Sequence, residues 1–272
     1  MEVNKYLNGA YAASTKEFRD NGGIVLSPSG IGKFYNEPNE WYLDRIGETT
    51  FDGNTYTVLG NALHAAIDAY WNGDEVTEED VTYWVQARYS EQMNVVTGQD
   101  KLGNDIPQVD LEFVTKNFMP MFTEWVSKYA ELYPKPDLRE SELELGLQEG
   151  MIMAGTLDGY ELDKKVIIDY KTAGRMPGKD AKISEAHRLQ LAAYAWMMIA
   201  EGKEVESIRV VYLVRPTKTI GPRVRVIDED LTDETLFDMK DTIEMMVGSW
   251  NAGKEYPHIL KLLFRPNRLA KW

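Results

Sequence analysis

Residues 155–194 constrain the fold of this chain more than any other stretch. Residues 155–172 (GTLDGYELDKKVIIDYKT) place apolar and β-branched residues on both sides of a short charged tetrapeptide at 162–165, which predicts two strands joined by a turn. Residues 184–198 (SEAHRLQLAAYAWMM) predict a helix soon afterwards. Strand patterns that alternate with helical patterns in this way predict an α/β fold.

The predicted hairpin carries two carboxylates and an amine. Asp158 lies on the first strand, and Asp169 and Lys171 lie on the second. Because strand side chains alternate between faces, Asp169 and Lys171 point to one side, and Ile168 and Tyr170 point to the other. Two carboxylates suit a hard divalent cation such as Mg²⁺ or Mn²⁺, and an ammonium balances charge beside it. A D-x-K pattern alone is more often a solvated ion pair, so that alternative stays open.

Groups of this kind are what the hydrolysis of a phosphodiester needs. A bound metal lowers the pKa of a water molecule and neutralises charge on the phosphate, and a lysine can orient the nucleophile or stabilise negative charge. Gln190 and Tyr194 are four residues apart on the predicted helix, so they share a face and can both turn toward the strand end.

These motifs resemble those of the PD-(D/E)XK nuclease superfamily and, within it, of the RecB-like exonuclease branch. The family pattern is G-x-x-D, then about ten residues, then two apolar residues and D/E-x-K-T, then Q-x-x-x-Y on a helix. The residues that meet it here are Gly155, Asp158, Asp169, Lys171, Thr172, Gln190 and Tyr194. The resemblance implies a restriction-endonuclease-like core, in which helices flank a central mixed β-sheet. It also implies a metal-dependent deoxyribonuclease, expected to be an exonuclease that acts at DNA ends in recombination, repair or replication.

The resemblance also implies a set of metal ligands. His64, Asp158 and Asp169 would hold Mg²⁺ or Mn²⁺, helped by the backbone carbonyl of Tyr170. His64 ends a G-x-x-x-H pattern that starts at Gly60, on a helix expected over residues 60–71, where relatives place a histidine ligand. A single histidine on such a helix is usually structural, and that alternative remains.

Further roles follow from the same resemblance. Lys171 would position or activate the attacking water, and Gln190 and Tyr194 would orient the lysine and the scissile phosphate. Family members often carry a glutamate about sixteen residues before the G-x-x-D aspartate. Glu142 fits that position best, whereas Glu140 and Glu144 are expected on a solvated strand face.

Composition sets the outer limits of these predictions. The chain has 272 residues, of which 43% are hydrophobic, enough for a sizeable core. We expect one domain over residues 1–272, with a helical insertion at about 72–135 built from amphipathic helices at 77–97 and 108–131. No run approaches the roughly 18 apolar residues of a membrane span, so a cytoplasmic location is expected. The chain has no cysteine, which excludes the cysteine-ligated iron–sulfur cluster of some relatives.

The charge of the chain bears on its partners. A net charge of -14 argues against simple nucleic-acid binding, because affinity for phosphates comes from lysine and arginine. The cations are grouped, however, and we expect them to hold DNA, as a duplex end or a single strand. They lie in a stretch without acids at 207–226, in the loop after Lys171 and near the C-terminus: Arg209, Arg215, Lys218, Arg223 and Arg225; Arg175, Lys179 and Lys182; Lys254, Lys261, Arg265, Arg268 and Lys271.

Several alternatives stay open at this point. An endonuclease or a CRISPR-adaptation-type nuclease could use the same core. A non-catalytic acidic protein that mimics nucleic acid is a different class of function, suggested by the pI of 4.8. The chain lacks a helicase phosphate-binding loop, so a helicase, a single-strand-binding protein or an annealing protein is a possible partner.

Overall fold

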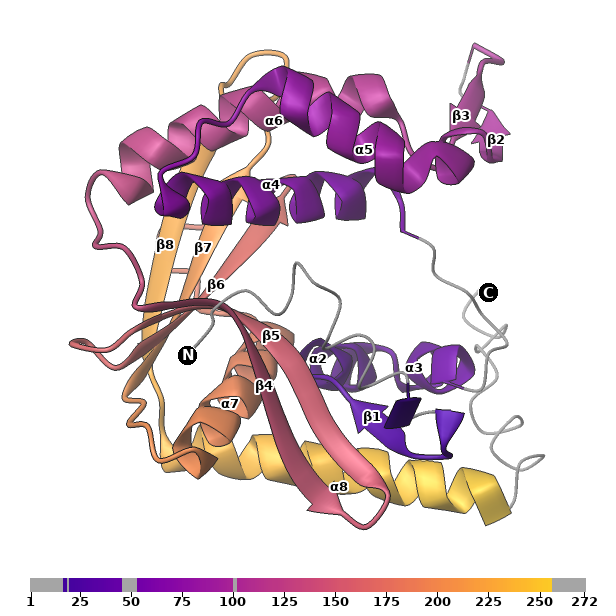
Figure 1. The fold of residues 1–272 in the computed structure, drawn as a ribbon, viewed down its shortest axis with the longest axis vertical. Coiled ribbons are helices and arrows are strands. Elements are labelled where there is room, and N and C mark those ends of the chain that lie inside the picture. The colour runs from indigo at the N-terminus through magenta and orange to yellow at the C-terminus, as the bar shows by residue number, and fades with distance from the viewer. Residues whose placement is uncertain (1–16, 19, 46–52, 100–101, 256–272) are drawn as a thin grey trace.

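A mixed β-sheet with helices on both faces forms the centre of the protein (Figure 1). The structure is a computed structural model that describes residues 17–18, 20–45, 53–99 and 102–255. Its elements in chain order are β1 (Ile24–Leu26), α2 (Pro28–Asn36), α3 (Pro38–Arg45), α4 (Thr55–Asn72), α5 (Glu78–Met93), β2 (Val96–Gln99), β3 (Asp105–Pro107), α6 (Leu111–Trp125), a π-helical turn (Val126–Ala130), β4 (Leu138–Gln148), β5 (Met151–Glu161), β6 (Val166–Ala173), α7 (Glu185–Ala200), β7 (Ser207–Val214), β8 (Arg223–Asp230) and α8 (Asp233–Glu255).

The main sheet has the strand order β1-β5-β6-β7-β8, and β4 pairs with the other edge of β5. β1 runs parallel to β5 and β6 runs parallel to β7, whereas the remaining neighbours are antiparallel. Parallel neighbours need a crossover connection, and α7 supplies the one between β6 and β7. The predicted α/β fold, a central mixed sheet flanked by helices, is confirmed.

The sheet forks along one edge of β5. β1 pairs with the first residues of β5, at 151–153, and β6 pairs with the last, at 159–161. Residues 154–158 between them have no ladder partner on this edge within the described chain. At this point β4 and β5 turn away from β6, β7 and β8 (Figure 1). Asp158 is the last residue before β5 and β6 join, so it lies at the apex of the fork.

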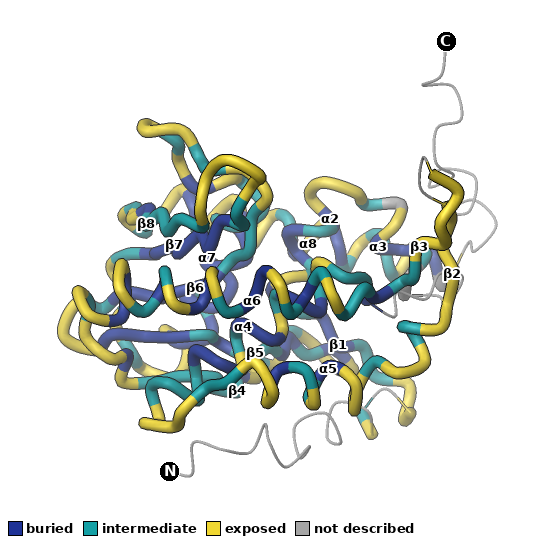
Figure 2. Tube along the Cα trace, turned by 90° about the horizontal axis from the view of Figure 1, so that it is seen from above, coloured by how far each residue is buried: buried dark blue, intermediate teal, exposed yellow. Residues whose placement is uncertain are grey.

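Two hydrophobic cores share the sheet. Helices α4, α5 and α6 cover one side of β6, β7 and β8, and α2, α7 and α8 lie on the other (Figure 1). Neighbours on β6 divide between the cores: Ile167 packs with α7, and Ile168 packs with α4 and α6. β7 is buried except at Ser207, and β6 is buried from Val166 to Tyr170 (Figure 2). The apolar side chains of β6 and β7 therefore pack against the helices on both faces of the sheet.

Local signals explain where several of these elements begin and turn. Ser27 caps α2 by accepting a hydrogen bond from the backbone N of Gly30 at 3.1 Å, and Pro28 is the first helical residue. The tetrapeptide at 162–165 joins β5 to β6, and Lys165 adopts a left-handed φ of 51°. The helix expected over residues 60–71 begins earlier, at Thr55, because Asn54 caps it.

The segment predicted as a helical insertion contains α5, a small β2–β3 hairpin and α6. The hairpin was not predicted, since Gly98 and the exposed, mostly polar residues around it indicate a loop. α6 packs on α4 and on the face of β6, β7 and β8, so it covers the central strands. Within the described residues, the structure contains no helix long and apolar enough to cross a membrane.

Candidate active site

Asp158 and His64 tie three elements together at the fork. Asp158 Oδ2 accepts a hydrogen bond from the backbone N of Tyr170 at 2.8 Å, and Asp158 Oδ1 lies 3.4 Å from His64 Nδ1. His64 Nε2 donates to the carbonyl oxygen of Tyr170 at 2.8 Å, since a carbonyl only accepts. The structure thus brings three predicted ligand groups from α4, β5 and β6 to one point.

Asp169 and Lys171 lie on the same side of β6, as strand alternation predicts. Lys171 Nζ lies 2.7 Å from Asp169 Oδ1, and Gln190 Nε2 on α7 donates to the same oxygen at 3.2 Å. The other oxygen, Asp169 Oδ2, is buried and has no hydrogen-bond partner among the described residues. A buried carboxylate oxygen without a donor is costly, which marks this atom as one that awaits a ligand.

Glu140 joins the group from β4, where it lies across from Asp158. One ligand atom from each of His64, Glu140 and Asp158 lies within 4.8 Å of the others. The φ of Glu140 is 41°, and the β4–β5 ladder is interrupted at this residue. The expectation that Glu140 faces solvent is therefore wrong, and Glu142, the glutamate predicted from the family pattern, is not part of this group.

Arg139 fixes the strand next to this unusual backbone. Its Nη1 lies 2.9 Å from Asp68 Oδ1, and its Nη2 donates to Asn72 Oδ1 at 2.8 Å, both on α4. These contacts hold the start of β4 against the helix that carries His64. The contacts of Arg139 with Asp68 and Asn72 therefore position Glu140 relative to His64.

The titratable groups of the site perturb one another. Burial raises the pKa of Glu140 to about 8 and that of Asp169 to about 6. Burial alone would lower the pKa of His64, but the Asp158 carboxylate outweighs it and raises the pKa to about 9. Burial would raise the pKa of Asp158, yet His64 and Lys171 hold it below its usual range. Carboxylates this close in a buried site retain protons that a cation would displace.

This donor set fits a divalent cation that prefers oxygen. Glu140 and Asp158 offer carboxylate oxygens beside the imidazole of His64, and Asp169, which is not part of that group of three, offers its buried Oδ2. The unpaired Asp169 Oδ2 is the kind of atom that a cation would satisfy. No thiolate competes, because the chain has no cysteine.

Comparisons with known proteins agree with this geometry. A family model described as the PD-(D/E)XK nuclease superfamily matches residues 25–259. The chain belongs to this superfamily. A search of the curated proteins found no match.

A search of solved structures found chains of low sequence identity that are similar to this PD-(D/E)XK chain. A candidate exonuclease from Eubacterium rectale has 15% sequence identity and a TM-score of 0.50, and the match covers 96% of this chain and 85% of that one. A phage-related exonuclease from Haemophilus somnus 129PT has 12% identity, a TM-score of 0.34 and coverage of 82% and 92%. LHK-Exo, solved in complex with dAMP, has 10% identity, a TM-score of 0.35 and coverage of 75% and 93%.

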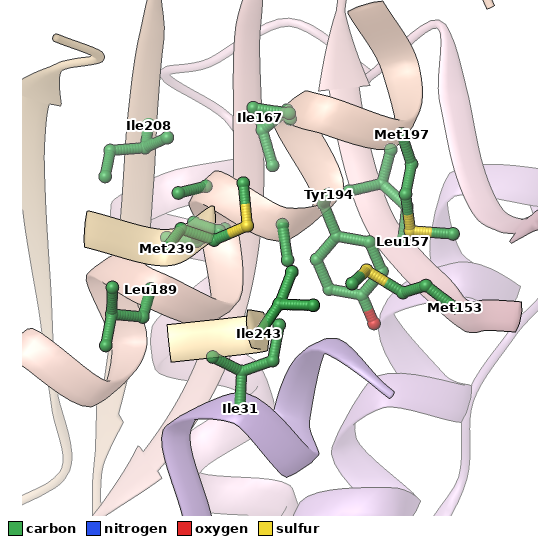
Figure 3. Packing of buried hydrophobic residues seen from close by; sticks show 14 of the residues in the cluster. Ile31, Met153, Leu157, Ile167, Leu189, Tyr194, Met197, Ile208, Met239 and Ile243 are labelled. Carbon is green, nitrogen blue, oxygen red and sulfur yellow. The ribbon is translucent and has the colours of Figure 1, made fainter. Parts of the chain in front are cut away.

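Two residues of the PD-(D/E)XK pattern, Gly155 and Tyr194, form a packing contact. A Cβ on Gly155 would lie 2.7 Å from Pro28 Cδ and 3.0 Å from the Tyr194 hydroxyl oxygen. Tyr194 is 7% exposed and packs in the α7-side core with Met153 and Leu157 (Figure 3). The glycine therefore lets α2 and α7 approach β5 closely, at the start of the fork.

The pair formed by His187 and Tyr212 extends the site of this PD-(D/E)XK chain beyond the predicted residues. Tyr212 on β7 lies beside Lys171 in the β6–β7 register, and its hydroxyl lies 3.2 Å from His187 Nδ1. Burial and the nearby Lys171 charge lower the pKa of His187 to about 4. The sequence placed His187 one helical turn before Gln190. Only the strand register could have revealed Tyr212.

The cations predicted to hold DNA divide into different groups. Arg209 is 6% exposed and forms ion pairs with Glu161 Oε1 at 2.7 Å and with Asp228 Oδ1 at 2.6 Å, so its predicted place in a DNA-binding cleft is wrong. The loop after β6 is held by Arg225, which donates to the carbonyl of Lys179. The C-terminal cations Lys261, Arg265, Arg268 and Lys271 lie outside the described residues.

Proposed function

We propose that this chain is a Mg²⁺- or Mn²⁺-dependent deoxyribonuclease of the RecB-like type, which cleaves phosphodiester bonds at DNA ends. The observation that carries the proposal is the placement of Asp158, Asp169 and Lys171 at the fork of the sheet, with Asp169 Oδ2 buried and unpaired. Membership of the nuclease superfamily supports the same reaction.

The ligands that we assign to the metal are His64, Glu140, Asp158 and Asp169. Glu140 enters this set because its carboxylate lies with His64 and Asp158, and the Tyr170 carbonyl remains a candidate ligand next to His64. A bound divalent cation would lower the pKa of a water molecule and neutralise charge on the phosphate. The pKa of Asp158 is lowered, so its carboxylate is ionised at neutral pH and can bind a cation.

Lys171 has an electrostatic role in this proposal. Burial would lower its pKa, but the carboxylates of Asp169 and Asp158 outweigh burial and raise it. The side chain is therefore a cation at neutral pH, and it is more suited to orient a nucleophile and stabilise negative charge than to remove a proton. Its 2.7 Å contact with Asp169 fixes the ammonium beside the ligand set.

Gln190 and Tyr194 act as positioning residues in the proposal. Gln190 and Lys171 both bind Asp169 Oδ1, which orients the carboxylate and leaves Oδ2 for the metal. Tyr194 packs beneath Gly155 and sets the separation of α7 from β5. From the sequence, both residues were expected to orient the lysine and the scissile phosphate. We now propose that Gln190 orients the Asp169 carboxylate and that Tyr194 sets the distance between α7 and β5.

Action at DNA ends is the finer part of the proposal. The Eubacterium rectale protein, which shares the fold over 96% of this chain, is named as a candidate exonuclease. An end-directed enzyme that has no helicase motif of its own suits a partner that exposes or captures single strands, such as a helicase or a single-strand-binding or annealing protein. Cleavage inside a strand is the rival proposal on the same core.

The test uses one DNA sequence in three forms: end-labelled linear duplex, end-labelled single strand and covalently closed circle. Each is incubated with Mg²⁺ or Mn²⁺, with and without EDTA. The proposal predicts metal-dependent release of short products from linear DNA and an intact circle. Nicking of the circle would establish an endonuclease, and cleavage in EDTA would contradict metal dependence. An absence of cleavage on all three forms with metal would favour the acidic, non-catalytic alternative.

A further inference from the structure

Arg215 is clamped between two aromatic rings just beyond β7. Its guanidinium carbon lies 4.4 Å from the ring centroid of Tyr56 and 5.4 Å from that of Phe113. The two rings meet edge to face, with centroids 5.5 Å apart. A guanidinium stacks well on aromatic faces and keeps its in-plane donors available when it does so.

No carboxylate of the described residues forms an ion pair with Arg215. Within the described chain, its only hydrogen bond is from its backbone N to the carbonyl of Ala173 at 2.9 Å. Arg209 and Arg139, in contrast, both form ion pairs with acids. The chain has 44 acidic and 30 basic residues, so acidic partners are plentiful. Arg215 differs from Arg209 and Arg139 because neutral rings, and not carboxylates, orient its guanidinium. Such a group is prepared for an anion from outside the chain.

Both rings of the clamp are carried by capped helix starts. Tyr56 lies in the first turn of α4, where its backbone N donates to the capping Asn54 Oδ1 at 2.9 Å. Phe113 lies in the first turn of α6, where its backbone N donates to the capping Asp110 Oδ1 at 3.0 Å. Two capped helix starts therefore hold the backbone that carries the rings, which limits the order that has to be gained when a ligand binds.

The clamp lies close to the proposed catalytic lysine. Arg215 Nη2 lies 2.5 Å from the position that a Cβ on Gly174 would take. Gly174 is three residues after Lys171, which corresponds to about 10 Å along an extended strand. Arg215 therefore lies at the same end of β6 as Lys171, and a DNA strand bound at Lys171 can continue to Arg215.

We propose that Arg215, Tyr56 and Phe113 form a strand-binding subsite, in which Arg215 binds a backbone phosphate of the DNA substrate and Tyr56 stacks on the adjacent base. Tyr56 is 55% exposed, so its ring retains free surface for a base. The subsite rests on the proposed nuclease function, since it binds the strand that the fork cleaves. It also explains how an acidic chain gains a local cationic contact.

The test measures the affinity of a fluorescein-labelled single-stranded oligothymidylate by anisotropy in Ca²⁺ over a series of salt concentrations. Arg215→Gln should weaken binding about tenfold, because a charge-assisted hydrogen bond is lost. It should also flatten the slope of log affinity against log salt by about 0.7, the value for one phosphate contact on a single strand. Tyr56→Ala should weaken binding at least about fivefold and leave the slope unchanged, because stacking involves no counterion release.

The matched control is Arg88→Gln. Arg88 also stacks on an aromatic ring, 5.3 Å from the centroid of Trp84 on α5, so the same chemical change is made at another stacked arginine. Wild-type affinity and slope in Arg88→Gln, with losses in Arg215→Gln, support the subsite. Equal affinity and slope in the two variants overturn it.

Two further measurements keep the result decisive. If Arg215→Gln unfolds, Arg215→Lys replaces it: a retained salt slope with weaker binding supports the subsite, and wild-type affinity contradicts the stacked geometry. Cleavage of linear DNA by the wild-type chain is measured in parallel. If the wild-type chain cleaves DNA and Arg215→Gln binds DNA as tightly as the wild type, the subsite is ruled out and the proposed function stands. If the wild-type chain neither binds nor cleaves DNA, both the subsite and the proposed function are ruled out.

Discussion

The carboxylate of Asp158 accepts a hydrogen bond from the backbone N–H of Tyr170, with 2.8 Å between Asp158 Oδ2 and Tyr170 N. The ladder between β5 and β6 begins at Gly159, the residue after Asp158, so the Asp158 side chain satisfies a backbone donor of β6 that pairing with β5 leaves free. The acid that the chemistry needs is therefore also the group that stabilises the fork. Any change at Asp158 alters both the site and the fold beside it.

Glu140→Gln tests the acid that the structure adds to the site. The change removes an anionic oxygen next to His64 and Asp158, so we expect calorimetric Mn²⁺ affinity to fall about tenfold or more. Glu144→Gln is the matched control, because Glu144 lies on the same strand and is exposed. Equal Mn²⁺ affinities in the two variants would remove Glu140 from the ligand set.

Gly155→Ala tests the packing at the start of the fork. The added Cβ would lie 2.7 Å from Pro28 Cδ, so α2 and α7 must shift, and we expect the free energy of unfolding to fall by about 1–3 kcal/mol. Gly146→Ala on β4 has no atom within 4 Å of its new Cβ and should not lose stability. Urea unfolding measures both. A Gly155→Ala variant as stable as Gly146→Ala would contradict the close approach.

His187 predicts a pH dependence of stability. Its folded pKa is about 4, below the ordinary value of 6.5, because burial and Lys171 disfavour its charged form. Between these values the unfolded chain binds a proton that the folded chain does not, so stability contributed by His187 falls as the pH is lowered from 6.5 to 4.

The measurement is urea unfolding at pH 7 and pH 5 for the wild-type chain and His187→Gln. The variant lacks this proton, so its stability should fall less between the two pH values than that of the wild type. An identical fall would mean that His187 is accessible to protons in the folded protein.

The sequence predicted the hairpin and its chemistry because both depend on local patterns. Alternation placed Asp169 and Lys171 on one face, and helical spacing placed Gln190 where it reaches Asp169. His64 followed from its position in a G-x-x-x-H pattern. Asp169, Lys171 and Gln190 lie on consecutive elements, where periodicity determines direction, whereas His64 reaches Tyr170 from 106 residues away and was found only from its motif.

Glu140 could not be found in this way. Strict alternation gives Glu140, Glu142 and Glu144 the same face, and nothing local indicates the left-handed φ of 41° at Glu140. Its role depends on its register opposite Asp158 and on the Arg139 clamp to α4. Arg209 on β7 was misplaced for a similar reason, since its acidic partners lie on the adjacent strand β8 and on β5, two strands away.

The central claim is that Lys171 serves the chemistry of a metal-loaded site without binding the metal. The most direct measurement compares Lys171→Ala with Lys203→Ala, whose lysine pairs with Glu201 near the C-terminal end of α7. Single-turnover cleavage of end-labelled DNA is followed in Mn²⁺, and Mn²⁺ affinity is measured by calorimetry on the same samples. The account predicts that Lys171→Ala lowers the cleavage rate at least about a hundredfold with no loss of Mn²⁺ affinity, because transition-state charge loses its counterion. Lys203→Ala should match the wild type in both. Wild-type turnover in Lys171→Ala would contradict the account.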